Sequence, residues 1–398
     1  MAASTRMRIG LNTLVASPLR PGSIFEYTQL LVESLAEHDR ENEWYIFVSE
    51  ANRGMFSKVS SPRFTFVLCG ASNEHRYRRI LSEQLLLPYK ASRLGLDVIY
   101  FLGDVCPFVR VCPYVIKLNT FHHFREPKAI GRVRAIYRRF AGNSSAGKAT
   151  RLIANSQSAK DDAISFVGLS AEKIAIIDEA IDHRFQPVDT GQTGFPVELE
   201  KLGVSANYVL FVSLLYRHKN VARLISAFSE VIRSTGSSHV LVVAGQDVEN
   251  LRPEFVALAT QLGIKERVVF LGRVSFADLV GLYQWADVFV YPSLSETFGK
   301  PPLEAMACGC PVVASAVGSI PEVVGDAALL CDPENDADIA NKITMILTDP
   351  ALAKTQVAKG YARVGHFSWS RVATETVDVL EAAAAQNSKS REDIIPKS

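Results

Sequence analysis

The regular alternation of short apolar runs with amphipathic segments is the feature that most constrains the fold of this 398-residue chain. Strands separated by helices pair in parallel through crossover connections, which builds sheets with helices on both faces. The alternation therefore predicts an α/β fold. In the first half, the expected strands are 7–14, 43–49, 64–68, 98–101, 114–118 and 151–154, and the expected helices are 27–37, 78–94, 131–140 and 158–167.

The alternation breaks once and then restarts. Residues 186–196 are rich in Pro, Gly and Thr, which are typical of a connecting loop, and the length of the chain also favours two domains. We expect an N-terminal domain at 1–187, a linker at 188–203 and a C-terminal domain at 204–368. After the break, the expected strands are 208–213, 239–244, 268–271, 287–291 and 312–314, and the expected helices are 220–234, 253–262, 276–286, 301–307, 336–347 and 369–384. Ligands of such sheets bind beyond the carboxyl ends of the strands, so the cleft between two doubly wound domains is the expected site.

Composition and charge exclude several classes of protein. The chain is 48% hydrophobic and 21% charged, as in globular proteins, and we find no 18-residue apolar run that would span a bilayer. The six cysteines lack zinc spacing and are expected to be reduced, buried thiols of a cytosolic protein. Residues 1–190 hold 25 Lys or Arg against 19 Asp or Glu, whereas residues 191–398 hold 18 against 23. The basic half indicates an anionic partner such as a membrane surface, or ordinary scatter. No nucleic-acid-binding motif is present.

The stretch SLSETFGKPPLEAMACG at 293–309 contains two glutamates that flank a loop. Glu296 follows an apolar strand, and the prolines at 301–302 begin a helix whose first turn contains Glu304. A helix N-terminus that follows a glycine suits a phosphate or a sugar ring, and two carboxylates can accept hydrogen bonds from vicinal hydroxyls. The alternative is that Glu304 only complements the helix dipole and Glu296 is a solvated loop residue.

A second cluster of polar residues supports the ligand site. Arg217, His218 and Lys219 follow the strand 208–213, and basic side chains beside a helix start suit a diphosphate. A nicotinamide dehydrogenase is disfavoured, because no GxGxxG follows any expected strand.

The residues from Ser293 to Ala305 form the pattern Ser-x-x-Glu-x-Phe-Gly-x-x-x-x-Glu-Ala without a gap. This pattern resembles the hallmark of the family-four retaining glycosyltransferases. The resemblance is densest at 208–335 and continues thinly over most of the chain. It implies a GT-B fold, in which two Rossmann-like domains face each other across a cleft. It also implies the transfer of a hexose, with mannose as our guess, from a GDP- or UDP-sugar to a glycan or lipid-linked acceptor, with retention and without a metal or cofactor.

The resemblance also assigns roles to individual residues. Lys219 would contact the diphosphate and Glu296 the sugar hydroxyls, as the catalytic pair, while Glu304 would bind the ribose. FLGRV (270–274) resembles the loop that contacts the nucleotide base, and FSWSRVA (367–373) resembles the segment that crosses back to the first domain, so a helix at 369–385 should pack there, before a disordered tail at 386–398. The expected donor-binding residues are Arg217, Lys219, Asn220, Gly272, Arg273, Glu296, Thr297, Phe298, Gly299, Lys300 and Glu304.

Four departures from the family pattern concern the phosphate site and the acceptor side. A Gly-Arg or Gly-Thr step is replaced by Ser213-Leu214, so a second phosphate-binding cation would have to be Arg217 or His218. The common Asn-Gly-Val-Asp turn appears here as EAID at 179–182. A His-Asp pair is replaced by Asn119-Thr120, and the glycine-rich acceptor loop is reduced to residues 21–23. The expected acceptor-side residues are Gly22, Ser23, Asn119, His122 and His123.

Two basic segments of the first half concern the expected partners. HRYRRI (75–80) and RVRAIYRRF (132–140) are compatible with contact to anionic lipid or with a solvated helix face. The basic segments are consistent with a cytoplasmic enzyme at the inner face of the cytoplasmic membrane. The resemblance, through its Lys-Asn pair and acceptor-side loop, implies a role in bacterial surface polysaccharide synthesis. A nucleotide-sugar 2-epimerase of the same fold and a non-catalytic nucleotide-sugar-binding relative are the alternatives.

Overall fold

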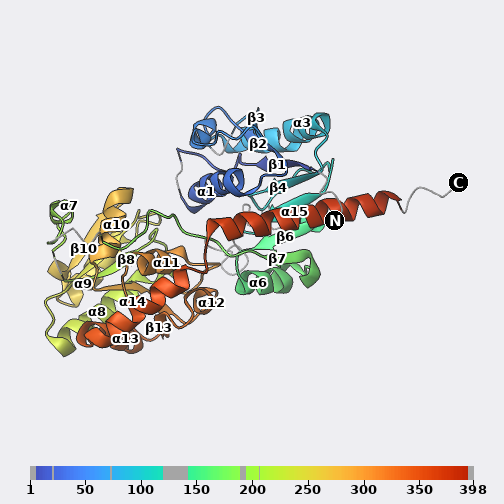
Figure 1. Ribbon diagram of the computed structural model, residues 1–398. Coiled ribbons are helices and arrows are strands. Elements are labelled where there is room, and N and C mark those ends of the chain that lie inside the picture. The colour runs from blue at the N-terminus through green and yellow to red at the C-terminus, as the bar shows by residue number, and fades with distance from the viewer. Residues whose placement is uncertain are drawn as a thin grey trace. The chain divides into compact units, whose positions relative to one another are not determined.

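The computed structural model describes residues 6–19, 22–71, 74–119, 142–188, 194–205 and 207–392, with only the backbone for 387–392. The chain divides into two compact units, of which unit 1 is Met1–Glu179 with Trp369–Ser398 and unit 2 is Ala180–Ser368. Each unit is a parallel sheet with helices against it (Figure 1). The predicted α/β fold is therefore confirmed.

Unit 1 contains seven strands in the order β3-β2-β1-β4-β5-β6-β7, and every neighbouring pair is parallel. All residues of β4 and β5 are buried, as expected for strands covered on both faces. The order reverses between β1 and β4. The strands are β1 (Arg8–Asn12), β2 (Glu43–Val48), β3 (Phe64–Leu68), β4 (Val98–Phe101), β5 (Tyr114–Lys117), β6 (Arg151–Ala154) and β7 (Ile174–Ile176).

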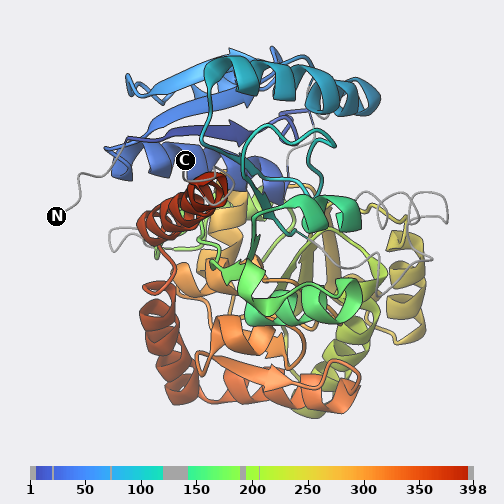
Figure 2. The same ribbon diagram turned by 90° about the vertical axis from the view of Figure 1, so that its right-hand side faces the viewer.

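The helices of unit 1 include the last helix of the chain. This helix packs on the first one: the ring centroids of Trp369 and Tyr27 are 5.5 Å apart, and the Ser34 hydroxyl donates to the Trp369 carbonyl at 2.8 Å. Figure 2 shows it beside the sheet of unit 1. The helices are α1 (Ser23–His38), α2 (Arg76–Leu81), the π-helical turn η2 (Ser82–Leu86), α3 (Leu87–Leu94), α6 (Gln157–Val167), α15 (Trp369–Glu392) and the 3-10 turns η1 (Arg53–Phe56) and η4 (Ala171–Lys173).

Unit 2 repeats the same winding with six parallel strands, in the order β10-β9-β8-β11-β12-β13. The strands are β8 (Tyr208–Val212), β9 (Val240–Ala244), β10 (Val268–Gly272), β11 (Val288–Tyr291), β12 (Val312–Ser315) and β13 (Ala328–Cys331). The helices are α7 (Val197–Lys201), α8 (Val221–Thr235), α9 (Arg252–Gln261), α10 (Phe276–Trp285), α11 (Lys300–Ala307), α12 (Ile320–Val324), α13 (Asp336–Thr348), α14 (Pro350–Val364) and the 3-10 turns η5 (Arg217–Lys219) and η6 (Lys265–Arg267).

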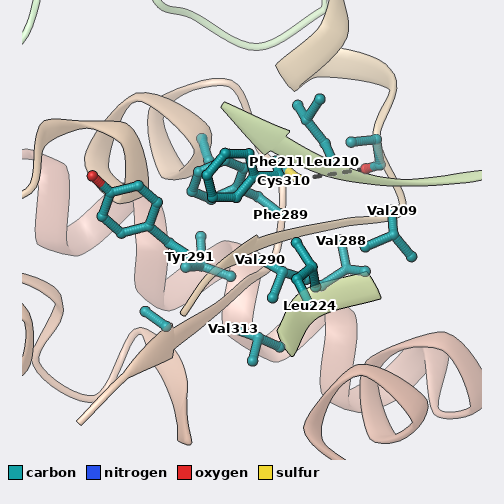
Figure 3. Close-up of a cluster of buried hydrophobic side chains, with 14 of the residues drawn as sticks. Val209, Leu210, Phe211, Leu224, Val288, Phe289, Val290, Tyr291, Cys310 and Val313 are labelled. Atoms are coloured by element: carbon teal, nitrogen blue, oxygen red, sulfur yellow. Dashed lines mark hydrogen bonds between the residues drawn. The ribbon is translucent and has the colours of Figure 1, made fainter. Parts of the chain in front are cut away.

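The core of unit 2 lies on both sides of β8 and β11. Figure 3 shows part of it, with Phe211, Phe289 and Cys310 close together and the Tyr291 ring at one end. The Tyr291 hydroxyl points away from the other labelled side chains. All six cysteines of the chain are free and buried, and burial raises the pKa of the Cys308 thiol to about 12. The thiols are therefore protonated at neutral pH.

The division between the units differs from the expected linker. Residues 194–205 include α7, whose Leu199 is buried in the core of unit 2. Along the chain, unit 1 ends at Glu179 and unit 2 begins at Ala180. The Pro, Gly and Thr residues that indicated a linker therefore precede a segment that packs as part of unit 2. The expected helix 131–140 lies outside the described residues. No helix in the described part of the chain is long and apolar enough to cross a membrane.

Candidate active site

The candidate site lies at the point where the strand order of unit 2 reverses. β8 and β11 are neighbours in the sheet although they are far apart in sequence. Lys219 lies in the loop after β8, and Glu296 lies in the loop after β11. Because loops that follow adjacent parallel strands meet at the same sheet edge, the topology brings the two residues together at the usual ligand site of a doubly wound sheet.

The two loops are joined by hydrogen bonds at their bases. Asn220 has left-handed backbone geometry (φ 65°), which asparagine tolerates better than most residues. Its side-chain amide donates to the carbonyls of Pro292 (3.0 Å) and Pro333 (2.7 Å). The Leu294 N–H donates to the His218 carbonyl at 2.8 Å. Asn220 thus holds the loops together, and its expected role in donor binding stays a prediction.

Lys219, Glu296 and Tyr291 form the centre of the site. The Lys219 Nζ lies 2.5 Å from Glu296 Oε1, and the two side chains are only 12% and 10% exposed. The Tyr291 hydroxyl donates to the same carboxylate oxygen at 2.8 Å and accepts from Lys219 Nζ at 3.0 Å. The residues predicted as the catalytic pair are therefore in direct contact, and a tyrosine at the end of β11 contacts both.

The charges of this group determine its protonation. Burial by itself raises the pKa of the Glu296 carboxyl, but the Lys219 ammonium and the hydrogen bonds from Lys219, Ser293 and Tyr291 outweigh it, so that the pKa lies below its ordinary value. Burial, followed by the Glu296 carboxylate, raises the pKa of Tyr291 well above its ordinary value. At neutral pH the site therefore contains a carboxylate and a neutral phenol.

The loop before α11 depends on a glycine. Gly299 caps the helix with φ 93°, a region that L-residues rarely adopt. A Cβ at this position would also lie closer to Cδ1 of Ile320 than real Cβ atoms come. The Ser319 hydroxyl, which is fully buried, donates to the carbonyls of Glu296 (3.2 Å) and Phe298 (2.9 Å) from the opposite side. The loop is thus held in one shape at a helix N-terminus.

Glu304 lies on α11, on the other side of this loop. The hydroxyl of the buried Tyr283 donates to Glu304 Oε2 at 3.0 Å. The Glu304 carboxylate also contributes to the raised pKa of Tyr291, after burial and Glu296. Both glutamates of the motif therefore act electrostatically on the same tyrosine. Phe298, by contrast, has a buried side chain packed edge-on against Phe367, with centroids 5.8 Å apart.

Both candidates for the predicted second cation have partners in the structure, and their role in phosphate binding stays a prediction. The Arg217 guanidinium is exposed and pairs with Glu254 of α9 at 2.9 Å, and the His218 ring stacks on Tyr216 at 5.4 Å. Leu214, at the family's cationic position, is 44% exposed. Lys219 is thus the cation that the structure brings to the centre of the site.

The other residues expected to bind the donor lie at the end of β10 and around the N-terminus of α11. Gly272 ends β10 with φ 68°, and its carbonyl accepts from the Gly245 N–H at 2.7 Å. Arg273 is exposed next to it, while Thr297 and Lys300 are half-buried around the α11 N-terminus. Their roles in donor binding stay predictions.

The acceptor-side residues belong to unit 1. Gly22 and Ser23 lie at the N-terminus of α1. The Asn119 amide donates to the Leu102 carbonyl at 2.7 Å and links the loops after β4 and β5. His122 and His123 lie outside the described residues, and so does the basic segment 132–140.

Glu179, one of the departures from the family pattern, has a partner that the sequence did not indicate. The Lys117 ammonium lies 2.7 Å from Glu179 Oε1, with both side chains almost buried, and the Asn155 amide donates to the same oxygen at 3.2 Å. Lys117 is the last residue of the buried strand β5. The one signal in the sequence was a lysine at the end of an apolar run, where a charged residue needs a partner if it is buried. Tyr291, Tyr283 and Ser319 were missed for a similar reason, since each looked like an ordinary residue of a strand, helix or turn.

Comparison with known proteins identifies the family. A family model described as "Glycosyl transferases group 1" matches residues 199–363. O-antigen chain mannosyltransferase B from Escherichia coli is 32% identical over 270 residues, which cover 66% of this chain and 70% of that protein. The chain belongs to the group 1 glycosyltransferases. The matched region contains Lys219, Glu296 and Glu304.

Two further comparisons show how much of the chain resembles known proteins in sequence and in fold. The serotype-specific mannosyltransferase WbdA from Escherichia coli is 29% identical over 68% of this glycosyltransferase, which spans only 33% of WbdA. A crystal structure of HepE from Anabaena, in complex with UDP-glucose, has a TM-score of 0.72 and 21% identity, and the match covers 95% of this chain and 100% of that one. The fold is GT-B, with two Rossmann-like domains, as the sequence predicted.

Proposed function

We propose that this group 1 glycosyltransferase transfers a hexose from a nucleoside-diphosphate sugar to a hydroxyl of a glycan or lipid-linked glycan, with retention of configuration. The observation that carries the proposal is the Lys219–Glu296 pair beside the α11 N-terminus. One group suits a diphosphate, the other suits sugar hydroxyls, and both lie at the strand-order reversal. Mannose is the sugar we favour, because the names of the relatives from Escherichia coli specify mannosyltransferases.

The departure of the nucleoside diphosphate is the difficult step, because negative charge accumulates on its oxygens. A lysine ammonium has three N–H donors, and the contacts with Tyr291 and Glu296 account for two of them among the described residues. The third would donate to a phosphate oxygen, together with the N–H groups at the start of α11. The acceptor proton would pass to the leaving phosphate on the same face of the sugar, so that the new bond forms where the old one breaks.

Glu296 would orient the donor sugar. Its carboxylate stays ionised because its pKa is lowered, and a carboxylate accepts hydrogen bonds from hydroxyls. Glu304, whose Oε2 already accepts from Tyr283, would bind the ribose hydroxyls. The chemistry would then rest on preorganised charges of the protein, with no metal needed. GDP- and UDP-sugars are the donors that we would test first.

The setting that we propose is the synthesis of bacterial surface polysaccharide at the inner face of the cytoplasmic membrane. The relative O-antigen chain mannosyltransferase B bears the name of such a polymer. A lipid-linked acceptor would lie in the membrane, so the enzyme would have to contact the membrane surface. The basic segments 75–80 and 132–140 would favour contact with anionic lipid.

The test is a turnover assay with labelled GDP-mannose and UDP-glucose and a bacterial membrane lipid extract as the source of acceptor. Lys219→Ala and Glu296→Ala should each lower transfer by ~10²–10³ without unfolding the protein. Lys359→Ala is the matched control, because Lys359 pairs with Asp326 on the surface of the same unit, and it should keep full activity.

The products distinguish the alternatives. A transferase releases one nucleoside diphosphate for each sugar attached to acceptor, and a retained anomeric configuration confirms the stereochemistry. Isomerised free sugar without any acceptor would indicate a 2-epimerase, and donor binding without turnover would indicate a non-catalytic relative. Near-normal transfer by either variant would refute the assignment of the pair.

A further inference from the structure

An exposed apolar stripe runs along the helical segment 76–94 of unit 1, away from the sheet. The side chains of Tyr77, Leu81, Leu85 and Tyr89 are 84%, 60%, 66% and 62% exposed. They recur every four residues, which places them along one side of the helix. Single exposed apolar residues are common, but a continuous row of large ones marks an interaction surface.

A π-helical turn keeps this row straight. In an α-helix of 3.6 residues per turn, each four-residue step overshoots one turn, so that such a row would wind around the helix. Ser82–Leu86 form a π turn, in which the Leu87 N–H donates to the Ser82 carbonyl, and its wider turn reduces the overshoot. π turns are rare and frequently occur at functional sites.

The opposite side of the segment is fixed to the domain. Leu87 and Ala91 are buried in the core of unit 1. The buried carboxylate of Glu83 accepts from the Asn12 amide at 3.0 Å and lies 3.3 Å from Arg79 Nη1. The outward direction of the stripe is therefore set by anchored packing.

A neighbouring loop extends the apolar surface. Phe108 and Val109 are 56% and 63% exposed, and the Phe108 N–H donates to Oε1 of Gln84, within the π turn, at 2.9 Å. The Lys148 ammonium lies 4.6 Å from the centre of the Phe108 ring. The loop and the helix thus present one surface.

Positive charges outnumber negative ones around this surface, although the half-buried Glu74 directly precedes the segment. The only acidic residue in 75–94 is the buried Glu83, whereas the segment contains five Lys or Arg, namely Arg76, Arg78, Arg79, Lys90 and Arg93. Arg110 and Lys148 add positive charge near Phe108. Tyrosines at the ends of an apolar row and basic side chains around it suit the headgroup region of a bilayer.

We propose that Tyr77, Leu81, Leu85, Tyr89, Phe108 and Val109, here called the docking surface, bind an anionic lipid bilayer. A second copy of the chain fits less well, because a two-fold interface would bring the basic rim of one copy against the same rim of the other. Anionic lipid instead complements the charge and accepts the apolar row. The proposal rests on the membrane setting of the proposed function and names the surface that makes the contact. It requires nothing of the donor site, so that failure of vesicle binding and failure of donor binding can be told apart.

The test is co-sedimentation of the full-length protein with vesicles of phosphatidylcholine alone or mixed with phosphatidylglycerol. The wild type should bind the anionic vesicles and lose binding as salt is raised. Leu81→Ser/Leu85→Ser/Tyr89→Ser and, separately, Arg76→Glu/Arg78→Glu should each lower the partition coefficient by about tenfold or more. The matched control, Val197→Ser/Leu262→Ser/Tyr361→Ser, removes exposed apolar residues of unit 2 and should change it less than about twofold.

Three results would overturn the proposal. They are a wild type that ignores anionic vesicles, a triple serine variant that binds as the wild type does, and a wild-type dimer in analytical ultracentrifugation that this variant dissociates, since the occupant would then be a second copy. Unchanged circular dichroism and melting temperature show that the variants are folded. Vesicle binding without any donor binding would leave the docking surface intact and remove the proposed function.

Discussion

At the scale of single residues, the candidate site depends on Tyr291 more than its place in an apolar strand suggests. Its ring is buried between Phe211 and Phe289, at centroid distances of 6.3 and 5.9 Å, while its hydroxyl contacts both Lys219 and Glu296. The core of unit 2 therefore positions the hydroxyl that contacts Lys219 and Glu296, the proposed catalytic pair. We regard Tyr291 as a positioning residue, since it acts through the other two.

Tyr291→Phe should lower donor affinity or transfer by about tenfold or more, because a hydrogen bond to a charged group contributes ~1.5–3 kcal/mol. The variant also removes one of the contacts that lower the pKa of Glu296. That pKa should rise, so donor affinity should disappear at a higher pH on acidification than in the wild type. Titration of donor binding from about pH 7 downward checks both effects.

Tyr291→Phe should also make the folded protein lose stability at a higher pH on acidification than the wild type does. Because the pKa of Glu296 is lowered below the ordinary value of 4.5, its contribution to stability is present above that pH and is lost as the pH falls through the folded-state pKa. Tyr208→Phe is the control, since this buried tyrosine donates to the Leu282 carbonyl in the same unit. If the pH at which stability is lost on acidification rose equally in Tyr291→Phe and Tyr208→Phe, the positioning role of Tyr291 would be contradicted.

At the scale of elements, the sequence predicted more of the strands and helices than of their connections. Short runs such as 98–101 and 151–154 became strands with the expected bounds, and all their residues but Arg151 are buried. The strands β7 and β13 and the helices α12 and α14 were not predicted. β7 and β13 are only three and four residues long and partly buried, so their pattern is weak. The site motif was predictable because prolines and a glycine fix the start of α11, whereas partners such as Lys117 for Glu179 depend on tertiary packing.

Gly299→Ala tests the element that carries the motif. A positive φ costs an L-residue about 1–3 kcal/mol, and the new Cβ would also meet Ile320, so unfolding free energy and donor affinity should both fall. Denaturant unfolding and a donor titration measure the two effects. Ile320 is fully buried, so Ile320→Ala alone also costs stability. If the two residues are in steric contact, the double variant should lose less unfolding free energy than the sum of the two single variants.

Gly263→Ala is the matched control for this variant. Gly263 also has a positive φ (70°), but a Cβ there would meet nothing within 4 Å, and it lies in the loop after α9. It should lose stability and keep donor affinity. If Gly299→Ala bound the donor as well as Gly263→Ala did, the loop before α11 would not be a donor site.

At the scale of the whole molecule, the two proposed functions fall on different units, whose seven- and six-stranded sheets are wound in the same way. Unit 2 contains the Lys219–Tyr291–Glu296 group and the residues matched by the family model. Unit 1 contains the docking surface and receives α15, the last helix of the chain. Donor binding and membrane binding should therefore be separable by substitutions, with donor variants leaving vesicle binding unchanged and the reverse.

The most direct measurement of the central claim is thermal unfolding of the wild type, Lys219→Ala and Lys359→Ala with GDP-, UDP-, dTDP- and ADP-sugars. A donor at about a hundred times its dissociation constant stabilises the folded state by ~2.7 kcal/mol, which raises the melting temperature by a few degrees. The account predicts such a rise with one nucleotide for the wild type and Lys359→Ala, and its loss in Lys219→Ala. A rise that persists in Lys219→Ala, or no rise with any donor in the wild type, would contradict the donor site.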